Sequence, residues 1–159
     1  CHHASVLGWS ADAALLARFA EVVTEVASWP GTRVVAIEDP ASYGSELARI
    51  PGVQAIRPTL RQLLALLAEV DVLVGNDSGP MHLAAAAGTA TVGVFHPHAA
   101  REFAPLGPGH HVLAPAADNA MKGTRPEAAI LLGVQVAEVI AAVRHALSRS
   151  IRTRCAAGS

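Results

Sequence analysis

The sequence predicts a doubly wound α/β fold, in which helices cover both faces of a parallel sheet. Short apolar runs alternate along the chain with segments whose apolar residues recur at helical spacing. Within the runs, apolar residues follow one another without polar residues between them, which is typical of parallel strands buried on both faces. No period of about 20–50 residues repeats, which disfavours a solenoid.

The first half of the chain contains one long helix and two short strands. Ser10 is the expected N-cap of the helix, and Trp29-Pro30-Gly31 ends it. Its apolar face is formed by Leu15, Leu16, Phe19, Val22, Val23 and Val26. The pattern then predicts a strand over 32–37, a short helix over 43–50 and a strand over 53–56.

The second half alternates helices and strands more regularly. Thr59 and Gln62 form a capping box at the start of a leucine-rich helix. Pro80 begins another helix, which continues through Ala87 and ends at Gly88. Strands are expected over 71–75, 91–95 and 111–114, and a last helix over 136–147. The prediction is a single α/β domain over 1–147, followed by a flexible C-terminal tail over 148–159.

Composition excludes several classes of protein. The 159 residues are 52% hydrophobic and 16% charged, too apolar for a disordered chain. Twelve basic and thirteen acidic residues leave no basic field for nucleic acid, and no apolar run reaches the length of a membrane helix. The two cysteines lie at opposite ends, which indicates no disulfide framework and fits a cytoplasmic protein. The chain begins at Cys1 rather than Met, so we expect a processed protein or a piece of a longer one.

The segment over 71–95 carries the chemistry. Asn76-Asp77-Ser78-Gly79 follows a strand and precedes a helix, where open α/β sheets bind ligands. The backbone N–H groups of Ser78, Gly79, Met81 and His82 are expected to point outward and attract phosphate. Gly79 lacks a Cβ that would block close approach, and His82 could reach a phosphate oxygen. A diphosphate would repel the Asp77 carboxylate, which is better suited to accept hydrogen bonds from sugar hydroxyls.

Simpler interpretations of the same residues remain open at this point. Asp77 or Ser78 could cap the helix, and His82 could be a half-buried structural histidine. A zinc site is disfavoured because no cysteine or regularly spaced glutamate accompanies the five histidines His82, His96, His98, His110 and His111.

Two further alternatives concern a hydrolase and a membrane. A triad of Asp77, Ser78 and His82 is disfavoured because the Gly-x-Ser-x-Gly elbow is absent. The basic C-terminal end is either a solvated helix end or a point of contact with an anionic membrane surface. That end contains Arg144, Arg149, Arg152 and Arg154.

Residues 76–86 closely resemble the signature of glycosyltransferase family 9, the ADP-heptose:lipopolysaccharide heptosyltransferase family. Flanking segments over 59–74, 91–105 and 134–147 are also similar to that family, whereas residues 1–57 match only in pattern. The resemblance implies a two-domain GT-B enzyme whose C-terminal domain, represented by this chain, holds the nucleotide-sugar donor. It implies no metal and no cofactor.

The same resemblance assigns roles to individual residues. Ser78, Gly79 and Met81 would bind the donor diphosphate through their main chain, Asp77 would hold the donor sugar, and His82 would assist near the phosphates. No catalytic residue is expected in this chain, because the carboxylate that activates the acceptor belongs to the family's N-terminal domain. That acceptor domain is the expected partner, and lipopolysaccharide biosynthesis would place the protein at the inner face of the membrane.

This sequence departs from the family at four places. The family's phosphate-contacting lysine is replaced by Val6-Leu7-Gly8, and the chain has a single lysine, Lys122. Glu38 is a weak candidate for the family's ribose-binding glutamate. Residues 57–59 and 96–99 differ from the family's Gly-Lys-Thr and Gly-Pro-Thr-Asp stretches. Because the loss of a cation removes a strong hydrogen bond, a non-catalytic or degenerate sugar-nucleotide-binding module is the alternative, and an epimerase-like GT-B protein is a third.

Overall fold

The structure, a computed structural model, describes residues 4–7, 13–38, 45–115 and 133–157. In this part of the chain, six parallel strands form one sheet in the order β3-β2-β1-β4-β5-β6. The strands are β1 (Ala4–Leu7), β2 (Arg33–Ile37), β3 (Val53–Ile56), β4 (Val72–Asn76), β5 (Ala90–Val94) and β6 (His110–Leu113). This is the strand order of a dinucleotide-binding fold, and it confirms the predicted doubly wound α/β class.

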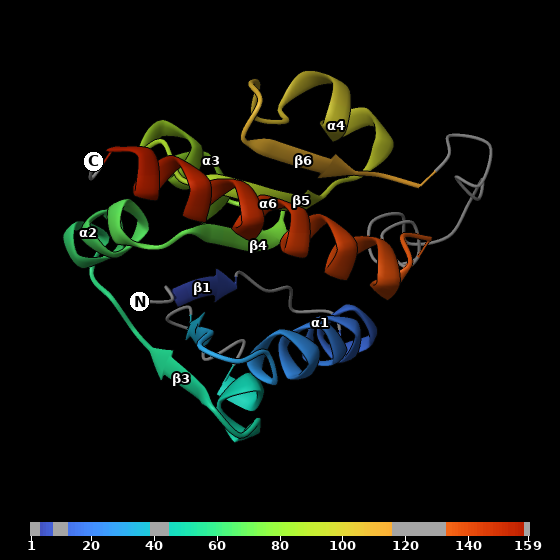
Figure 1. The fold of residues 1–159 in the computed structure, drawn as a ribbon. Helices are drawn as coiled ribbons and strands as arrows, with labels where there is room; N and C mark the ends of the chain where they lie inside the picture. The colour runs from blue at the N-terminus through green and yellow to red at the C-terminus, as the bar shows by residue number, and fades with distance from the viewer. Residues whose placement is uncertain (1–3, 8–12, 39–44, 116–132, 158–159) are drawn as a thin grey trace.

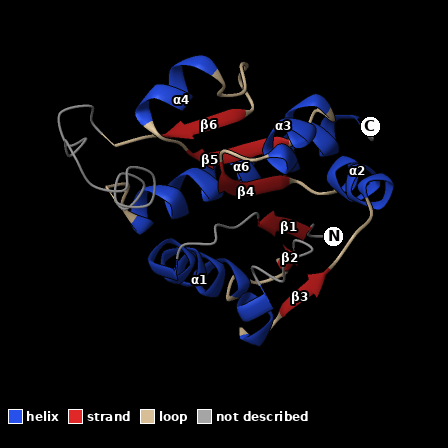
Figure 2. Cartoon of the chain, turned by 180° about the vertical axis from the view of Figure 1, so that it is seen from behind, coloured by secondary structure: helices blue, strands red, loops and turns tan. Residues whose placement is uncertain are grey.

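Helical segments cover both faces of the sheet (Figures 1 and 2). One face carries α1 (Ala13–Ala27), the 3-10 helix η1 (Ser45–Arg49) and α6 (Val136–Ala157). The other face carries α2 (Leu60–Glu69), α3 (Gly79–Ala86) and α4 (Pro97–Glu102). Each face of the sheet has a hydrophobic core: the first core lies under α1 and α6, and the second core lies under α2, α3 and α4. Strand β4 is a continuous apolar run because Val72 and Val74 pack into the first core, whereas Leu73 packs into the second.

Local sequence signals account for most element boundaries. The capping box at Thr59 is present: its hydroxyl accepts from the Gln62 N–H at 3.4 Å, and Gln62 Oε1 accepts from the Thr59 N–H at 2.9 Å. The predicted strand over 53–56 is confirmed as β3. The expected short helix over 43–50 is a 3-10 helix over Ser45–Arg49, and Ser10 lies outside the described residues.

Two elements were not predicted from the sequence. Strand β1 is only four residues long, yet it occupies the centre of the sheet between β2 and β4. The segment after β5, for which the pattern predicted no helix, forms α4, with Pro97 at its first position. His96 caps this helix, since its Nδ1 accepts from the His98 N–H at 3.1 Å.

The prediction of a flexible tail from residue 148 is wrong as far as Ala157, because α6 continues to that residue. The Ser150 hydroxyl donates to Asp71 Oδ1 at 2.7 Å, which ties this part of α6 to the start of β4. Asp71 is 3% exposed. A polar contact with a buried carboxylate leaves no hydrophobic periodicity in the sequence, which is why the pattern ended the helix too early.

None of the helices in the described part of the chain is long and apolar enough to cross a membrane.

Candidate functional site

The site predicted from the sequence lies where the strand order reverses. Strands β1 and β4 are neighbours, and the chain proceeds outward from them in opposite directions to β3 and β6. In sheets of this kind, ligands bind beyond the carboxyl ends of the strands at this switch point. The loop of Asp77 and Ser78 leaves the carboxyl end of β4 there and leads directly into α3.

The N-terminus of α3 is not capped by a side chain. Ser78 occupies the N-cap position with extended backbone angles (φ −161°, ψ 159°), but its hydroxyl donates back to the Asn76 carbonyl at 3.2 Å. Among the described residues, the N–H groups of Ser78 and Gly79 have no hydrogen-bond acceptor. The capping interpretation therefore fails for Ser78, and two backbone donors remain for an anion.

Met81 and His82 do not offer the free N–H groups expected from the sequence. The Met81 N–H donates to the Ser78 carbonyl at 3.0 Å, and the His82 N–H reaches the same oxygen at 3.4 Å. The Met81 side chain is fully buried in the second core. The expectation that Met81 presents a free donor is corrected: the first turn of α3 closes on Ser78, which consumes that donor.

Gly79 gives the helix N-terminus an open surface. A Cβ added at this position would have no other heavy atom within 4 Å. Nothing in the described fold thus requires glycine here for packing, and the effect of the missing side chain is to leave the backbone approachable from solvent.

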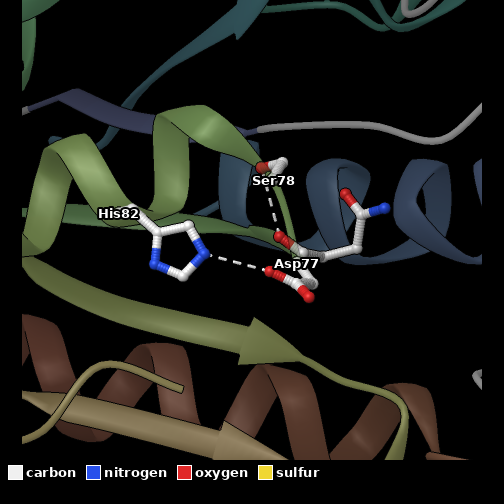
Figure 3. Close-up of polar contacts among 4 residues, drawn as sticks. Asp77, Ser78 and His82 are labelled. Atoms are coloured by element: carbon white, nitrogen blue, oxygen red, sulfur yellow. Dashed lines mark hydrogen bonds and ion pairs between the residues drawn. The ribbon is translucent and has the colours of Figure 1, made fainter. Parts of the chain in front are cut away.

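Asp77 and His82 contact one another across the first turn of α3 (Figure 3). Nε2 of His82 lies 3.1 Å from Oδ1 of Asp77, and the side chains are 45% and 36% exposed, respectively. His82 thus has a partner at the surface, and the Asp77 carboxylate is engaged by a side chain rather than by backbone N–H groups. The Ser78 hydroxyl points to the Asn76 carbonyl instead of the imidazole, which excludes the catalytic triad.

Asn76 begins the stretch that the sequence placed at this edge, but the sequence suggested no role for its side chain. Its Oδ1 is buried and has no hydrogen-bond partner in the described part of the chain. A buried oxygen without a donor costs free energy, so ligand or water donors are expected for such an atom. The available signal was its position as the last residue of β4, immediately before Asp77.

Glu38 lies at the same edge of the sheet, directly after β2. Its N–H donates to the Ile56 carbonyl at 2.8 Å, and its Oε2 accepts from Arg57 Nε at 3.2 Å. Two strand spacings separate β2 from β4, which corresponds to roughly 10 Å. The Glu38 side chain is 15% exposed, and the Arg57 side chain is 52% exposed.

Metal-binding clusters of three or more histidine, cysteine, aspartate or glutamate residues do not occur among the described residues. The five histidines considered from the sequence are dispersed. His98 lies on α4, with Nε2 3.5 Å from Glu102 Oε1, whereas His110 and His111 begin β6 at the opposite edge of the sheet.

Solved structures with the same architecture define the class of this domain. E. coli ADP-heptose LPS heptosyltransferase II superposes with a TM-score of 0.74 and 18% identity, over 92% of this chain and 47% of that chain. E. coli heptosyltransferase WaaC with ADP-2-deoxy-2-fluoro heptose gives a TM-score of 0.67 and 18% identity, over 90% and 42% of the respective chains. The domain has the α/β fold that forms half of a GT-B heptosyltransferase.

The amino-acid sequence is similar to that of one enzyme family. Residues 54–129 match glycosyltransferase family 9 (heptosyltransferase). The lipopolysaccharide core heptosyltransferase OpsX of Haemophilus influenzae is 30% identical over 116 residues, which cover 68% of this chain and 33% of that protein. Residues 54–129 thus form a region similar to glycosyltransferase family 9 heptosyltransferases, and the chain spans one third of the length of this curated relative.

Proposed function

We propose that this chain is the donor-binding domain of a glycosyltransferase that uses a nucleotide-diphosphate sugar of the ADP-heptose type. The observation that carries the proposal is the uncapped N-terminus of α3 beside the Asp77 carboxylate, at the switch point of the sheet. The family 9 region includes this loop. WaaC, which shares the fold, was solved with an ADP-heptose analogue.

The diphosphate binds at the start of α3. The N–H groups of Ser78 and Gly79 donate to phosphate oxygens, and the helix dipole adds a favourable field. The open surface at Gly79 allows the phosphate to approach the backbone closely. His82 is one turn away, and its exposed ring lies near this end of the helix while it contacts Asp77.

The donor sugar binds beside Asp77. A carboxylate is a strong acceptor for sugar hydroxyls, and His82 holds this one on the side of the loop away from Ser78. The unpartnered Asn76 Oδ1 supplies a second acceptor next to it. Glu38 lies two strand spacings away and accepts a hydrogen bond from a hydroxyl of the nucleoside ribose. Arg57 fixes the orientation of the Glu38 carboxylate.

In the transfer reaction, a hydroxyl of the acceptor attacks the anomeric carbon of the donor sugar, and the nucleoside diphosphate departs. The α3 N-terminus stabilises the negative charge that develops on the leaving group. The base that takes the hydroxyl proton comes from an acceptor-binding domain outside this chain. An acceptor of the lipopolysaccharide type places the reaction on the cytoplasmic side, at the inner face of a membrane.

A non-catalytic sugar-nucleotide-binding module is the second candidate. It is favoured by the apolar end of β1, where Leu7 pairs with Val74 of β4 and no lysine supplies a charge to the diphosphate. The coding sequence upstream of Cys1 discriminates between the two candidates. A preceding α/β domain with an acceptor-activating carboxylate favours the transferase, whereas a start codon adjacent to Cys1 favours the module.

Calorimetric titration of the folded chain with ADP-heptose, ADP, a UDP-sugar and a GDP-sugar tests donor binding. We expect ADP-heptose to bind most tightly, and we expect Asp77→Ala to weaken it about tenfold, the effect of losing one charged hydrogen bond. The same variant should change ADP affinity less than threefold, because ADP has no donor sugar. Absence of binding by all four ligands would refute the donor domain, and equal losses for ADP-heptose and ADP would refute the role of Asp77.

A further inference from the structure

A pocket lies at the amino-terminal edge of the sheet, at the opposite ends of the strands from the loop of Asp77. Its volume is about 410 Å³, within the range of small-molecule sites. It is lined by the segments that precede β4, β5 and β6 and by the last described side chains of α6. Figure 1 shows this end of α6 beside the starting ends of β4 and β5. The length of β5 separates the pocket from the α3 N-terminus by roughly 16 Å.

Basic side chains from β6 and α6 meet at this pocket. His111 and Arg149 both line it. The His111 ring lies against His145, with the ring centroids 5.2 Å apart and the planes at 75°. Burial is the largest cause that lowers the pKa of His111, and the neighbouring charges of His145, Arg149 and His110 lower it further. The neighbouring basic groups thus repel one another when protonated, and an anion among them would relieve that repulsion.

The carboxylate at the pocket is almost fully buried. Asp71 lines the same pocket, but it is 3% exposed and accepts the Ser150 hydroxyl at 2.7 Å. His110 is also fixed, since its Nδ1 lies 3.0 Å from the Thr91 hydroxyl. Among the basic groups that line the pocket, Arg149 is exposed and His111 is partly exposed.

We propose that this pocket binds the phosphate group of a small phosphorylated molecule. The Arg149 guanidinium and the protonated His111 imidazole donate charge-assisted hydrogen bonds to the phosphate oxygens. The rest of the molecule occupies the space along Gly88, Thr89 and Gly109, because the pocket is larger than a phosphate ion alone requires. This site is independent of the proposed donor site, from which it is separated by the length of the sheet.

The test follows the histidine ring signals of the whole chain by NMR, with ribose 5-phosphate as the probe and ribose as the neutral control. We expect ribose 5-phosphate to shift the His111 and His145 signals, to raise the pKa of His111 and to bind at least fivefold more tightly at pH 6 than at pH 8. Ribose should shift neither signal. Equal effects of the two ligands, or a response of His82 without one of His111, would overturn the proposal.

Two variants locate the contact. Arg149→Gln and His111→Gln should each weaken ribose 5-phosphate at least fivefold, whereas Asp77→Ala should leave its affinity at this pocket unchanged. Far-ultraviolet circular dichroism verifies that each variant is folded. If one of the two variants does not fold, the affinity of the other decides whether the site is correct. Inorganic phosphate is the comparison ligand. Binding of phosphate as tight as that of ribose 5-phosphate would refute an organic phosphate as the occupant, and unchanged affinity in both variants would refute the site.

Discussion

The His82 imidazole joins the first turn of α3 to the loop that follows β4, because its Nε2 lies 3.1 Å from Asp77 Oδ1. This contact orients a carboxylate that no described backbone N–H group holds. Both side chains are more than one third exposed, so the contact contributes little to folding. Its main consequence is for the position of Asp77 at the candidate site.

A double-mutant cycle on this pair should separate binding from stability. We expect Asp77→Ala and His82→Ala each to weaken ADP-heptose about five- to tenfold, and the double variant to lose less than the product, because the two residues act through one contact. The free energy of unfolding should change by less than about 1 kcal/mol in each variant. Calorimetry and urea unfolding measure the two quantities.

The control for this cycle is Arg144→Ala, which removes a comparable exposed ion pair with Glu25, 3.8 Å long, on the opposite face of the sheet. Its ADP-heptose affinity should equal that of the unaltered chain. If the double variant lost affinity by the full product of the two single losses, Asp77 and His82 would act independently, which would contradict a shared role.

The ring of Phe95 leaves no room for a side chain at position 93, which glycine occupies. A Cβ at Gly93 would overlap that ring, and Phe95 is fully buried in the second core. We expect Gly93→Ala to lower the free energy of unfolding by about 1–3 kcal/mol, the usual cost of overpacking. Combining it with Phe95→Leu should cost less than the sum of the single changes, since the smaller side chain removes the overlap.

Gly79→Ala is the matched control, because a Cβ at Gly79 meets no other atom within 4 Å. Its free energy of unfolding should stay within about 0.5 kcal/mol of the original value, as for other surface substitutions. Urea denaturation compares the two alanine variants directly, and equal destabilisation by both would contradict this account of Gly93.

The sequence predicted those parts of the fold that hydrophobic periodicity and caps specify. The capping box at Thr59 and the continuous run of β4 are local signals, and both are present. Strand β1 was missed, and it is recognised from its parallel pairing with β2 and β4. The end of α6 was missed because a distant hydrogen bond between Ser150 and Asp71 holds it.

The candidate site was predicted in position but not in detail. The motif placed Asp77, Ser78 and Gly79 at the end of a strand, where the structure has them. Sequence spacing alone could not show that the Met81 N–H is used by Ser78, that His82 turns toward Asp77, or that Asn76 Oδ1 lacks a donor. These depend on side-chain rotamers and on where the first helical turn closes.

The Ser150 contact with Asp71 should stabilise the C-terminal part of α6. We expect Ser150→Ala to cost about 1–3 kcal/mol, because a buried carboxylate loses a donor. Hydrogen exchange should show faster exchange at the end of α6 in this variant. Ser148→Ala is the control on the same helix, since the Ser148 hydroxyl donates within α6, to the His145 carbonyl at 2.8 Å. Equal effects of the two changes would indicate that helix propensity, rather than the Asp71 contact, determines the loss.

The two histidines at the start of β6 should make stability depend on pH. Burial lowers the pKa of His110, and burial together with nearby basic groups lowers that of His111, whereas both keep the ordinary value of 6.5 in the unfolded chain. As the pH falls through this range, the unfolded chain therefore binds more protons than the folded chain does. The contribution of the two histidines to the free energy of unfolding is present above pH 6.5 and is lost progressively below it. Urea unfolding in phosphate-free buffer at about pH 5.5 and 7.5 should show a smaller difference between the two pH values for the double variant His110→Gln, His111→Gln than for the unaltered chain. An identical difference in both proteins would show that these histidines do not contribute to the pH dependence.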